Sequence, residues 1–455
     1  MGVEIINHSE LCNHGNAMLR EDALLLLAKG IEAVDPGIKT RELIKLENAV
    51  LTVKGKSYRL DRIGKIYFVG TGKGSFPIAA ELENILGDYL VKGILAVKKG
   101  EKRRLRKISI RESGHPVPDE NSIKSAVEIV SLLNEVREGD IVFAAITGGA
   151  TSMTVLPPEG ISLNDIRLIN EMLLKSGAVI SEMNTVRRHL CQLKGGKLVS
   201  LAQPAEIITL TLDTVSDDIM PWPDMCKPDP TTFKDAFNVL KKYGLTGKTP
   251  ESILSYFRKG VKTGSGETLK NLDSMRHTLV SVGNPAAACN EMYRQAKKMK
   301  YHSYILGTHI EGESRDVGIF LSGITDEIIK NNRPFKTPCV IISGGETTVT
   351  INGGNGSGGP NMETVLSFAI QCKSLFPWCF AAVDSDGTDG PTRYAGAIAD
   401  NYFYKELGKG MDPEKYLRNH DSGTLLKRTG NIIETGHTGT NVMNLRILII
   451  GEPNK

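Results

Sequence analysis

The amino-acid sequence predicts an α/β protein with parallel sheets covered on both faces, divided between two domains. Short apolar runs alternate with helical patterns along the chain, as in parallel-sheet folds. The 455 residues exceed what one ordinary hydrophobic core accommodates, so two domains are expected. Glycine-rich turns follow several of the apolar runs, and open α/β sheets bind ligands beyond the carboxyl ends of their strands.

The elements follow from the spacing of apolar residues. The expected strands are the short apolar runs 66–69, 93–97, 141–146, 206–212, 279–282, 303–306, 340–342, 380–383 and 445–450. The expected helices are 17–34, 76–86, 122–133, 163–174, 232–242, 286–298, 314–329 and 362–372. In the first helix, leucine, alanine and isoleucine recur at helical spacing and predict a core-facing stripe.

The domain boundary is expected in the segment 246–271, where strand-like runs are sparse. It holds Pro250 and a short helical pattern, then Gly260, Gly264 and Gly266. We therefore predict an N-terminal domain over residues 1–265 and a C-terminal domain over 266–455, with the proline-flanked segment 334–338 as a second candidate joint.

Composition excludes several classes of protein. Hydrophobic residues make up 40% and charged residues 24%, which is typical of soluble globular domains. A net charge of +4 with 6% aromatics argues against nucleic-acid binding. No membrane span or secretory signal is visible. Seven scattered cysteines without a CxxC pair favour a reduced cytoplasm.

The turn 70–75 follows a strong strand and opens a helix, where backbone N–H groups bind anions. It is not a Walker A loop, because Tyr67 stands where that pattern has its first glycine. It is a poor dinucleotide fingerprint, because Ser75 takes the last glycine position and the next strand ends in Lys98 and not in an acid. Lys73 within the turn favours an anion site, with an ordinary tight turn as the alternative.

Two later turns resemble each other, at residues 146–152 and 342–348. Each ends a strand with a hydroxyl residue and two glycines, Gly148-Gly149 in one and Ser343-Gly344-Gly345 in the other. One interpretation is that each domain offers one anion-facing turn; the other is that strand-end turns commonly use glycine.

Histidine and basic residues form two further candidates. His115 lies in a proline-rich turn, where it contacts a substrate or simply bonds to backbone. The stretch 184–189, on an expected helix, and the segment 194–197 are basic. They predict either a solvated face or a cationic wall for an acidic substrate.

Carboxylates follow two of the expected strands. Asp213 ends one strand and could accept a proton or bind a metal, while Asp217 or Asp218 caps a helix. Asp386 and Asp389 lie on a glycine-rich turn with Thr388 between them, an arrangement that suits Mg²⁺. A purely structural Asp-Gly turn is the alternative.

In this order, the motifs resemble the glycerate 2-kinase family over nearly the whole chain. The most specific are GTGKGS (70–75), GHPVPDE (114–120), ITGGATS (146–152), NTVRRHL (184–190), SDD (216–218), DPTTF (229–233), SGGETTVTI (343–351), DGTDGPT (386–392) and TGTNV (438–442). The resemblance implies a large Rossmann-like N-terminal domain with a mostly parallel sheet, of the DUF4147 type. A smaller α/β C-terminal domain, called MOFRL, follows it, and the active site lies between the two domains.

The resemblance also implies an activity and roles for particular residues. Members transfer the γ-phosphoryl group of ATP, with Mg²⁺, to a hydroxyl of a small hydroxy acid. Lys73 is similar to the family's active-site lysine and Asp213 to its strand-end aspartate. Asp386 and Asp389 belong to its acidic loop and are expected to bind the metal. The glycine pairs with Ser343, and Thr388, are expected to bind the nucleotide. No nucleic-acid or membrane partner is expected, and a homodimer is one option.

The sequence departs from the family pattern at several positions. Pro360 stands where members usually have an arginine, residues 220–225 replace a different segment, and His437 is unusual in its loop. We hypothesise that Arg393, with His437, supplies the missing cation, so Arg393→Ala should cripple turnover. The departures keep two alternatives open: a non-catalytic nucleotide or metabolite sensor, and a hydroxypyruvate-type reductase, against which the missing ribose-binding acid argues.

Overall fold

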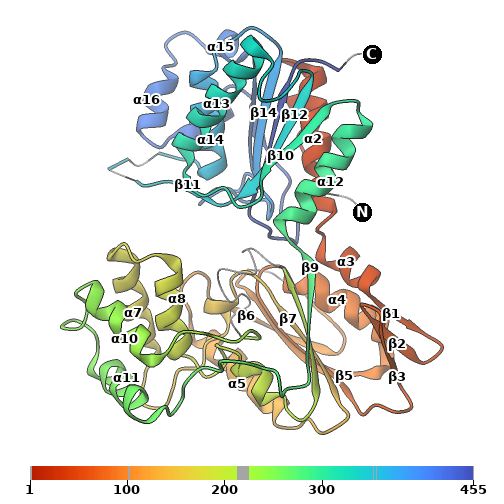
Figure 1. Cartoon of the computed structure of the whole chain (residues 1–455), viewed down its shortest axis with the longest axis vertical. Coiled ribbons are helices and arrows are strands. Elements are labelled where there is room, and N and C mark those ends of the chain that lie inside the picture. Colours follow the sequence, from red (N-terminus) through yellow and green to blue (C-terminus); the bar gives the residue numbers. More distant parts are fainter. Residues whose placement is uncertain (1–2, 101–102, 213–224, 352, 355, 454–455) are drawn as a thin grey trace. The chain divides into compact units, whose positions relative to one another are not determined.

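The computed structural model describes residues 3–100, 103–212, 225–351, 353–354 and 356–453 (Figure 1). The chain divides into two compact units. Unit 2 runs from Pro36 to Val282, and unit 1 combines residues 1–35 with residues 283–455.

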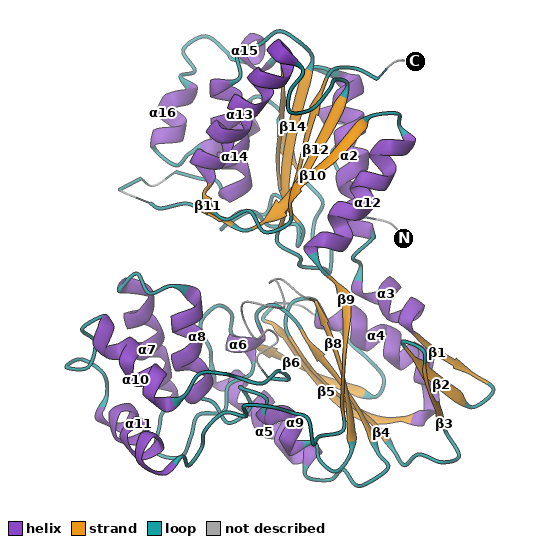
Figure 2. Cartoon of the chain, in the orientation of Figure 1, coloured by secondary structure: helices purple, strands orange, loops and turns teal. Residues whose placement is uncertain are grey.

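Unit 2 is built on a six-stranded sheet whose order is β6-β5-β4-β7-β8-β9 (Figure 2). Its strands are β4 (Ile66–Thr71), β5 (Leu90–Lys98), β6 (Ile108–Ser113), β7 (Ile141–Ile146), β8 (Glu206–Leu212) and β9 (His277–Gly283). From β6 through β8, each strand runs parallel to its neighbours. Every residue of β4 and β7 is buried, as expected for strands covered on both faces.

Helices surround this sheet and form a second core beside it. The helices are α3 (Pro36–Leu43), α4 (Ser75–Leu86), α5 (Glu120–Leu133), α6 (Ala150–Met153), α7 (Leu163–Lys175), α8 (Ile180–His189), α9 (Lys197–Leu201), α10 (Phe233–Lys242) and α11 (Glu251–Thr263). Helices α5 and α9 pack on one sheet face. Helices α7, α8, α10 and α11 share a separate apolar cluster around Phe233 and Phe257. A small antiparallel sheet of β1 (Ile44–Glu47), β2 (Val50–Val53) and β3 (Lys56–Arg59) completes the unit.

Unit 1 is built on a mixed sheet with the order β10-β12-β17-β14-β15-β16. Its strands are β10 (His302–Gly307), β12 (Cys339–Gly345), β14 (Trp378–Asp384), β15 (Gly396–Asp400), β16 (Ile432–Ile433) and β17 (Asn444–Ile450). Strand β17 is antiparallel to both of its neighbours, β12 and β14, which therefore run in the same direction.

Helices cover both faces of the unit 1 sheet. Helices α2 (Ala17–Glu32) and α12 (Pro285–Lys298) lie on one face, and α13 (Ser314–Asn331) and α14 (Pro360–Gln371) on the other (Figure 2). A short ladder joins β11 (Gly312–Glu313) to β13 (Thr347–Thr348). The small elements are α1 (His8–Leu11), α15 (Phe403–Glu406), α16 (Pro413–Arg418) and α17 (Ser422–Arg428).

The division into units differs from the boundary expected from sequence, 265/266, in two ways. It falls after β9, at residue 283, and it assigns the first 35 residues to the C-terminal part. Buried polar contacts explain the second difference. Arg20 on α2 forms a fully buried ion pair with Asp400 at the end of β15, and Tyr301 donates a hydrogen bond of 2.5 Å to Asp22.

The expected α/β class, with a mostly parallel sheet in the larger part, is confirmed. All nine predicted strands correspond to strands of the structure. The antiparallel sheet β1–β3 and strands β6 and β15 were not predicted, and the sheet of unit 1 is mixed and not parallel. In the described part of the chain, no helix is long and apolar enough to cross a membrane.

Candidate functional site

In unit 2, the turns after β4 and β7 are joined by hydrogen bonds. The backbone N–H of Lys73 donates to the carbonyl of Gly148 at 2.8 Å. Gly74 N–H donates to Thr147 Oγ1 at 3.0 Å, and Thr147 N–H donates to Thr71 O at 3.0 Å. Because β4 and β7 are adjacent and parallel, their carboxyl ends lie at one edge of the sheet. Two of the sequence-predicted anion turns therefore form one structure, called here the basic turn region.

Two glycines of this region have a physical requirement to be glycine. Gly72 has φ of +119°, and a Cβ there would lie 2.4 Å from the carbonyl oxygen of Thr147. Gly149 has φ of +90°, and a Cβ there would lie 3.2 Å from the His115 ring. Residues with a side chain rarely adopt such backbone angles. Glycine at these two positions therefore allows the two turns and His115 to approach closely.

His115 supports the second turn from the loop after β6. Its Nδ1 lies 2.8 Å from Ser152 Oγ, and that hydroxyl also donates to Gly149 O at 3.2 Å. The structure therefore places His115 against the Gly148-Gly149 turn, through the Ser152 side chain.

The basic stretch 184–189 lies on α8, and it is not a solvated face. Arg188 is buried and paired with Asp229, with 3.0 Å between Nε and Oδ2. His189 is fully buried, with its ring nitrogens 2.8 Å from the Thr185 carbonyl and 2.8 Å from Glu267 Oε1. Burial raises the pKa of Glu267, but hydrogen bonds from backbone N–H groups outweigh it and lower that pKa to about 2.

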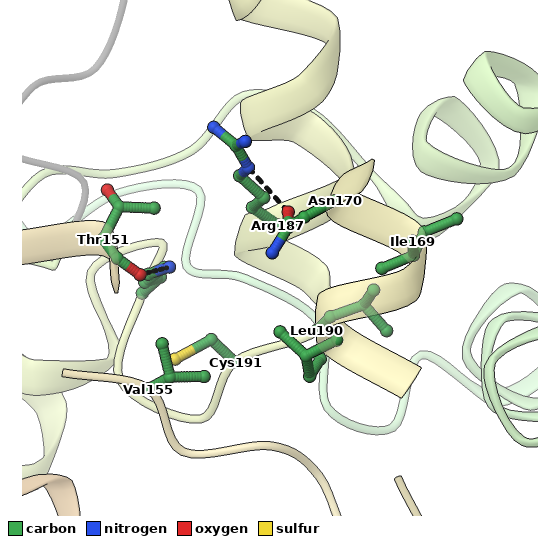
Figure 3. A pocket seen from close by; sticks show the side chains of 9 residues that line it. Thr151, Val155, Ile169, Asn170, Arg187, Leu190 and Cys191 are labelled. Carbon is green, nitrogen blue, oxygen red and sulfur yellow. Dashed lines mark hydrogen bonds between the residues drawn. The ribbon is translucent and has the colours of Figure 1, made fainter. Parts of the chain in front are cut away.

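Arg187 points the other way and lines a small pocket (Figure 3). Its Nε donates to Asn170 Oδ1 at 2.8 Å. The ammonium of Lys194, with 2% of the residue exposed, donates to the carbonyl of Thr151 at 2.9 Å. The lining residues are Thr151, Val155, Ile166, Ile169, Asn170, Arg187, Leu190, Cys191 and Lys194. The basic stretch thus contributes one side of a concave, cationic pocket beside the basic turn region.

In unit 1, three of the predicted glycine-rich loops meet at one edge of the sheet. Strand β12 ends at Gly345, β14 ends at Asp384 and β17 begins at Asn444, and these three residues are in register. The glycine-rich segment 353–361 joins these loops, because Asn361 Nδ2 donates to Asn444 Oδ1 at 2.9 Å. We call this group of loops the acidic loop region.

The glycine pair of this region is packed tightly against the chain. Gly345 has φ of +130°, and a Cβ there would lie 2.2 Å from the backbone nitrogen of Ile310. Ile310 N–H donates to Gly344 O at 2.9 Å, and Ser343 before it is 3% exposed. The predicted nucleotide-binding turn is therefore braced on one side by the segment after β10.

Asp386 and Thr388 form a compact turn. Asp386 Oδ1 accepts hydrogen bonds from Thr388 N–H at 2.9 Å and from Thr388 Oγ1 at 2.6 Å. The Asp386 N–H in turn donates to Asp384 Oδ1 at 3.0 Å. Two carboxylates, Asp384 and Asp386, thus lie on one short turn after β14.

Asp389, predicted as a second metal ligand, caps the start of α14. Its Oδ1 accepts from Asn361 N–H and Nδ2, both at 3.0 Å, and its Oδ2 accepts from Met362 N–H at 2.8 Å. The residue is fully buried, and burial raises the pKa of Asp389 to about 6 despite these hydrogen bonds. Both carboxylate oxygens already bond to the helix N-terminus.

A buried arginine lies close to this cap. Arg446 on β17 is 1% exposed, and its Nη2 donates to Thr347 Oγ1 at 3.1 Å. Its Nε and Nη1 have no acceptor among the described residues. Burial lowers the pKa of Arg446 to about 10, although Asp389 and Asp384 attract the charge. Its signal in the sequence is a basic residue inside an otherwise apolar strand.

The glycines of the segment 353–361 are explained by packing. A Cβ on Gly356 would lie 2.4 Å from His420 O, and one on Gly359 would lie 2.4 Å from the carboxyl carbon of Asp389. Ser357 N–H also donates to Asp421 Oδ1 at 2.9 Å. The glycines of this loop let its backbone pass close to residues 419–423.

Arg393 and His437, which were also predicted as site residues, take no part in the hydrogen bonds described above. Arg393 is exposed, with its guanidinium 5.3 Å from the centre of the Tyr394 ring. His437 is also exposed, and no contact in the described structure joins it to Arg393. Asp213 and the segment 220–224 lie outside the described residues, and Met225 is buried.

The acidic loop region has the donor set that Mg²⁺ uses. The described residues contain no group of three or more histidine, cysteine, aspartate or glutamate side chains that could hold a metal. Mg²⁺ usually takes only one or two carboxylates, with water and substrate phosphates completing its shell. Asp386 with its neighbour Asp384 therefore fits such an ion, whereas the carboxylate of Asp389 is committed to α14.

Comparison with known proteins gives consistent results. The family model described as a domain of unknown function, DUF4147, matches residues 22–258, and the MOFRL family model matches residues 339–444. The chain is 40% identical to a glycerate 2-kinase of Pyrococcus horikoshii over 95% of this chain and 97% of the relative. It is 37% identical to a D-glycerate 2-kinase of Thermotoga maritima, covering 95% and 98%. A putative hydroxypyruvate reductase of Agrobacterium vitis is 36% identical, covering 85% and 88%.

Solved structures agree with the sequence comparison. A crystal structure of a Thermotoga maritima glycerate kinase superposes with a TM-score of 0.82 at 35% identity, covering 95% of this chain and 99% of that one. A Pyrococcus horikoshii protein superposes with a TM-score of 0.81 at 39% identity, covering 95% and 98%.

Proposed function

Since this chain belongs to the glycerate 2-kinase family, we propose that it transfers the γ-phosphoryl group of ATP to a hydroxyl of glycerate or a related small hydroxy acid. It is an enzyme of the class that phosphorylates alcohol groups. ATP as the nucleotide, Mg²⁺ as the metal and the individual residue roles are the finer parts of the proposal.

One observation carries the proposal: the Lys73 turn and the Gly148-Gly149 turn are hydrogen-bonded into one structure at the carboxyl ends of two parallel strands. Phosphoryl transfer requires little covalent chemistry from the protein. It requires positioning, and positive groups against the negative charge that spreads over the transferred phosphoryl. A lysine inside a glycine turn at a helix start supplies both requirements.

The basic turn region acts on the reacting phosphoryl group and on the acceptor. The Lys73 ammonium stabilises the negative charge, and backbone N–H groups of the Gly148-Gly149 turn orient an anion. Asp213, directly after β8, orients or deprotonates the acceptor hydroxyl.

The acidic loop region handles the nucleotide and its metal. The Ser343-Gly344-Gly345 turn and Thr388 contact the nucleotide. Asp386 holds Mg²⁺ directly or through water, and Asp389 supports this loop by its bonds to the start of α14. Mg²⁺ would supply charge neutralisation on the phosphates. Arg393, exposed on the same loop, contributes a cation in place of the arginine that Pro360 replaces.

The cellular setting follows from the cysteines. The seven cysteines form no disulfide among the described residues, and six of them are buried. We propose that the protein works in a reducing cytoplasm, where such thiols persist.

An acceptor screen tests the proposal. The protein is incubated with ATP, Mg²⁺ and one hydroxy acid of three to six carbons at a time, and ADP is followed with Lys73→Met as the control. Acid-dependent ADP formation that the variant lacks supports the kinase. ATP binding without ADP formation from any acid would instead support a nucleotide sensor.

The same screen also tests for reductase activity. Hydroxypyruvate is added with NADH or NADPH, and oxidation of the cofactor is followed. The turn 70–75 lacks the full dinucleotide fingerprint, and β5 ends at Lys98. We therefore expect no oxidation of either cofactor; hydroxypyruvate-dependent oxidation without kinase activity would overturn the proposal.

A further inference from the structure

We propose that the pocket lined by Arg187 and Lys194 binds the carboxylate of the hydroxy-acid substrate. The inference rests on the proposed function and deepens it, because it assigns the acid end of the substrate to a particular place. It concerns unit 2 alone, and it gives a role to the basic stretch 184–189, to which the proposed mechanism assigns none.

The charges of the pocket favour an anion. Its lining residues include two cations, Arg187 and Lys194, and no aspartate or glutamate. Lys194 is 98% buried by side chains and backbone, and within the described residues its ammonium forms no ion pair. An ammonium has three donors, and the described contacts assign one of them to the carbonyl of Thr151. Keeping a buried charge without a counter-ion is unfavourable, so an anion in the pocket would relieve that cost.

Two hydrogen bonds fix the orientation of the Arg187 guanidinium at the edge of the pocket. Its Nε donates to Asn170 Oδ1 at 2.8 Å (Figure 3). Its Nη1 donates to Asn184 Oδ1 at 3.3 Å. A guanidinium whose rotation is restricted in this way loses less entropy when it binds, and its geometry matches a carboxylate.

The size of the pocket selects the group that enters it. About 20 Å³ is open inside it, which suits one water molecule or the oxygens of a carboxylate and excludes a nucleotide. Val155, Ile166 and Leu190 form apolar walls. Such walls exclude water and strengthen the attraction between a bound carboxylate and the two cations.

The pocket adjoins the basic turn region along the chain, because Thr151 lines it. Gly148 O accepts the hydrogen bond from Lys73 N–H, and Thr151 O, three residues later, accepts the one from Lys194. Three residues span at most about 11 Å. A small acid whose carboxylate lies in the pocket would therefore be held near the turn that is proposed to hold the phosphoryl group.

A purely structural lysine is the competing explanation, in which Lys194 only fastens α6 to the loop before α9. The two explanations differ in what they predict for substrate charge. A carboxylate site distinguishes glycerate from glycerol, whereas a structural lysine does not.

Steady-state kinetics of Lys194→Met, Arg187→Gln and Arg187→Lys test the inference. Lys175→Met is the matched control, because Lys175 lies on α7, which also lines the pocket, but its exposed side chain pairs with Glu171 outside it. We expect the first two variants to raise KM for glycerate at least tenfold, with KM for ATP within twofold of wild type. Their preference for glycerate over glycerol should fall, and Arg187→Lys should recover part of the loss.

A calorimetric titration with glycerate makes the test independent of turnover. Weaker glycerate binding in Lys194→Met or Arg187→Gln, with Lys175→Met like wild type, supports the carboxylate site. Unchanged KM and unchanged binding in both pocket variants overturn it, as does a parallel change in the constants for glycerate and ATP. If the wild-type protein binds glycerate through these residues yet forms no ADP, the kinase proposal fails and the carboxylate site stands.

Discussion

The basic turn region of unit 2 and the acidic loop region of unit 1 use the same backbone device with opposite charge. Each places two glycines at the end of a buried strand, and in each the second glycine has a positive φ, +90° at Gly149 and +130° at Gly345. Lys73 and Lys194 accompany the first pair, and Asp386 accompanies the second. The comparison teaches that the turn provides only the backbone, and that the neighbouring side chains decide which ligand it suits.

The two regions also differ in how far their polar groups are already used. In the acidic loop region, both oxygens of Asp389 bond to α14 and Gly345 contacts Ile310 closely. In the basic turn region, a pocket remains beside Lys194. Substitutions should therefore affect stability mainly in the acidic loop region, and binding or turnover mainly in the basic turn region.

The largest effect is expected for Lys73→Met in the basic turn region. Removing one positive group at a phosphoryl-transfer centre should lower kcat by about 10²- to 10³-fold. The free energy of unfolding should stay within about 0.5 kcal/mol of wild type, as measured by urea titration. Lys99→Met, at an exposed position, is the control. Equal loss of activity in Lys73→Met and Lys99→Met would contradict a specific role for Lys73.

Alanine at the two equivalent glycines compares the regions directly. A Cβ at Gly345 meets the backbone of Ile310 at 2.2 Å, whereas one at Gly149 first meets the Met153 side chain at 3.0 Å. We expect Gly345→Ala to reduce the free energy of unfolding by about 3 kcal/mol and Gly149→Ala by about 1 kcal/mol. Urea denaturation measures both; the reverse order would show that the turn of unit 2 is the more tightly packed.

The substitution Asp389→Asn tests whether this carboxylate is buried at the start of α14 with a raised pKa. Its pKa rises from 3.8 to about 6 on folding, so the folded state binds a proton between those values. The corresponding stabilisation is complete below about pH 4 and is lost as the pH rises through about 6.

Asparagine carries no such proton. Relative to wild type, the variant should therefore gain up to about 3 kcal/mol of stability between pH 4 and pH 7. Urea titrations at the two pH values measure this change. A difference between variant and wild type that is independent of pH would contradict the raised pKa of Asp389.

The smallest effect is expected for Arg393→Ala. The guanidinium is exposed and lies over the Tyr394 ring, so water screens its charge. If it acts as the replacement cation of the acidic loop, we expect kcat to fall about tenfold, with partial recovery in Arg393→Lys. Unchanged kinetics in Arg393→Ala would remove this residue from the mechanism.

Some elements could be predicted from sequence because their environment is uniform. Strands β7 and β8 are nearly continuous apolar runs buried on both faces, and their predicted bounds match. Strand β6 has a partly exposed, polar pattern at the sheet edge, so its residues 108–113 lacked that signal. Polar strands β1 and β3 were missed for the same reason.

For the candidate site, turns were predicted better than contacts. The Lys73 turn and the Gly148 turn were predicted separately from sequence, and the structure shows that they follow adjacent strands. The capping role of Asp389 depends on Asn361 and Met362 of another loop, and the pocket at Lys194 depends on α7 and α8 packing together. No local pattern contains those pairings.

The sequence alone therefore determined the α/β class, the glycine turns and the types of charge beside them, because apolar periodicity and turn preference act over a few neighbouring residues. Only the tertiary structure decided that α2 belongs with the C-terminal sheet and that Asp389 holds a helix start. It also decided that Arg187 and Lys194 line a pocket while Arg188 and His189 are buried. Burial and hydrogen-bond partners come from segments far apart in the chain, and folding is what brings those segments into contact.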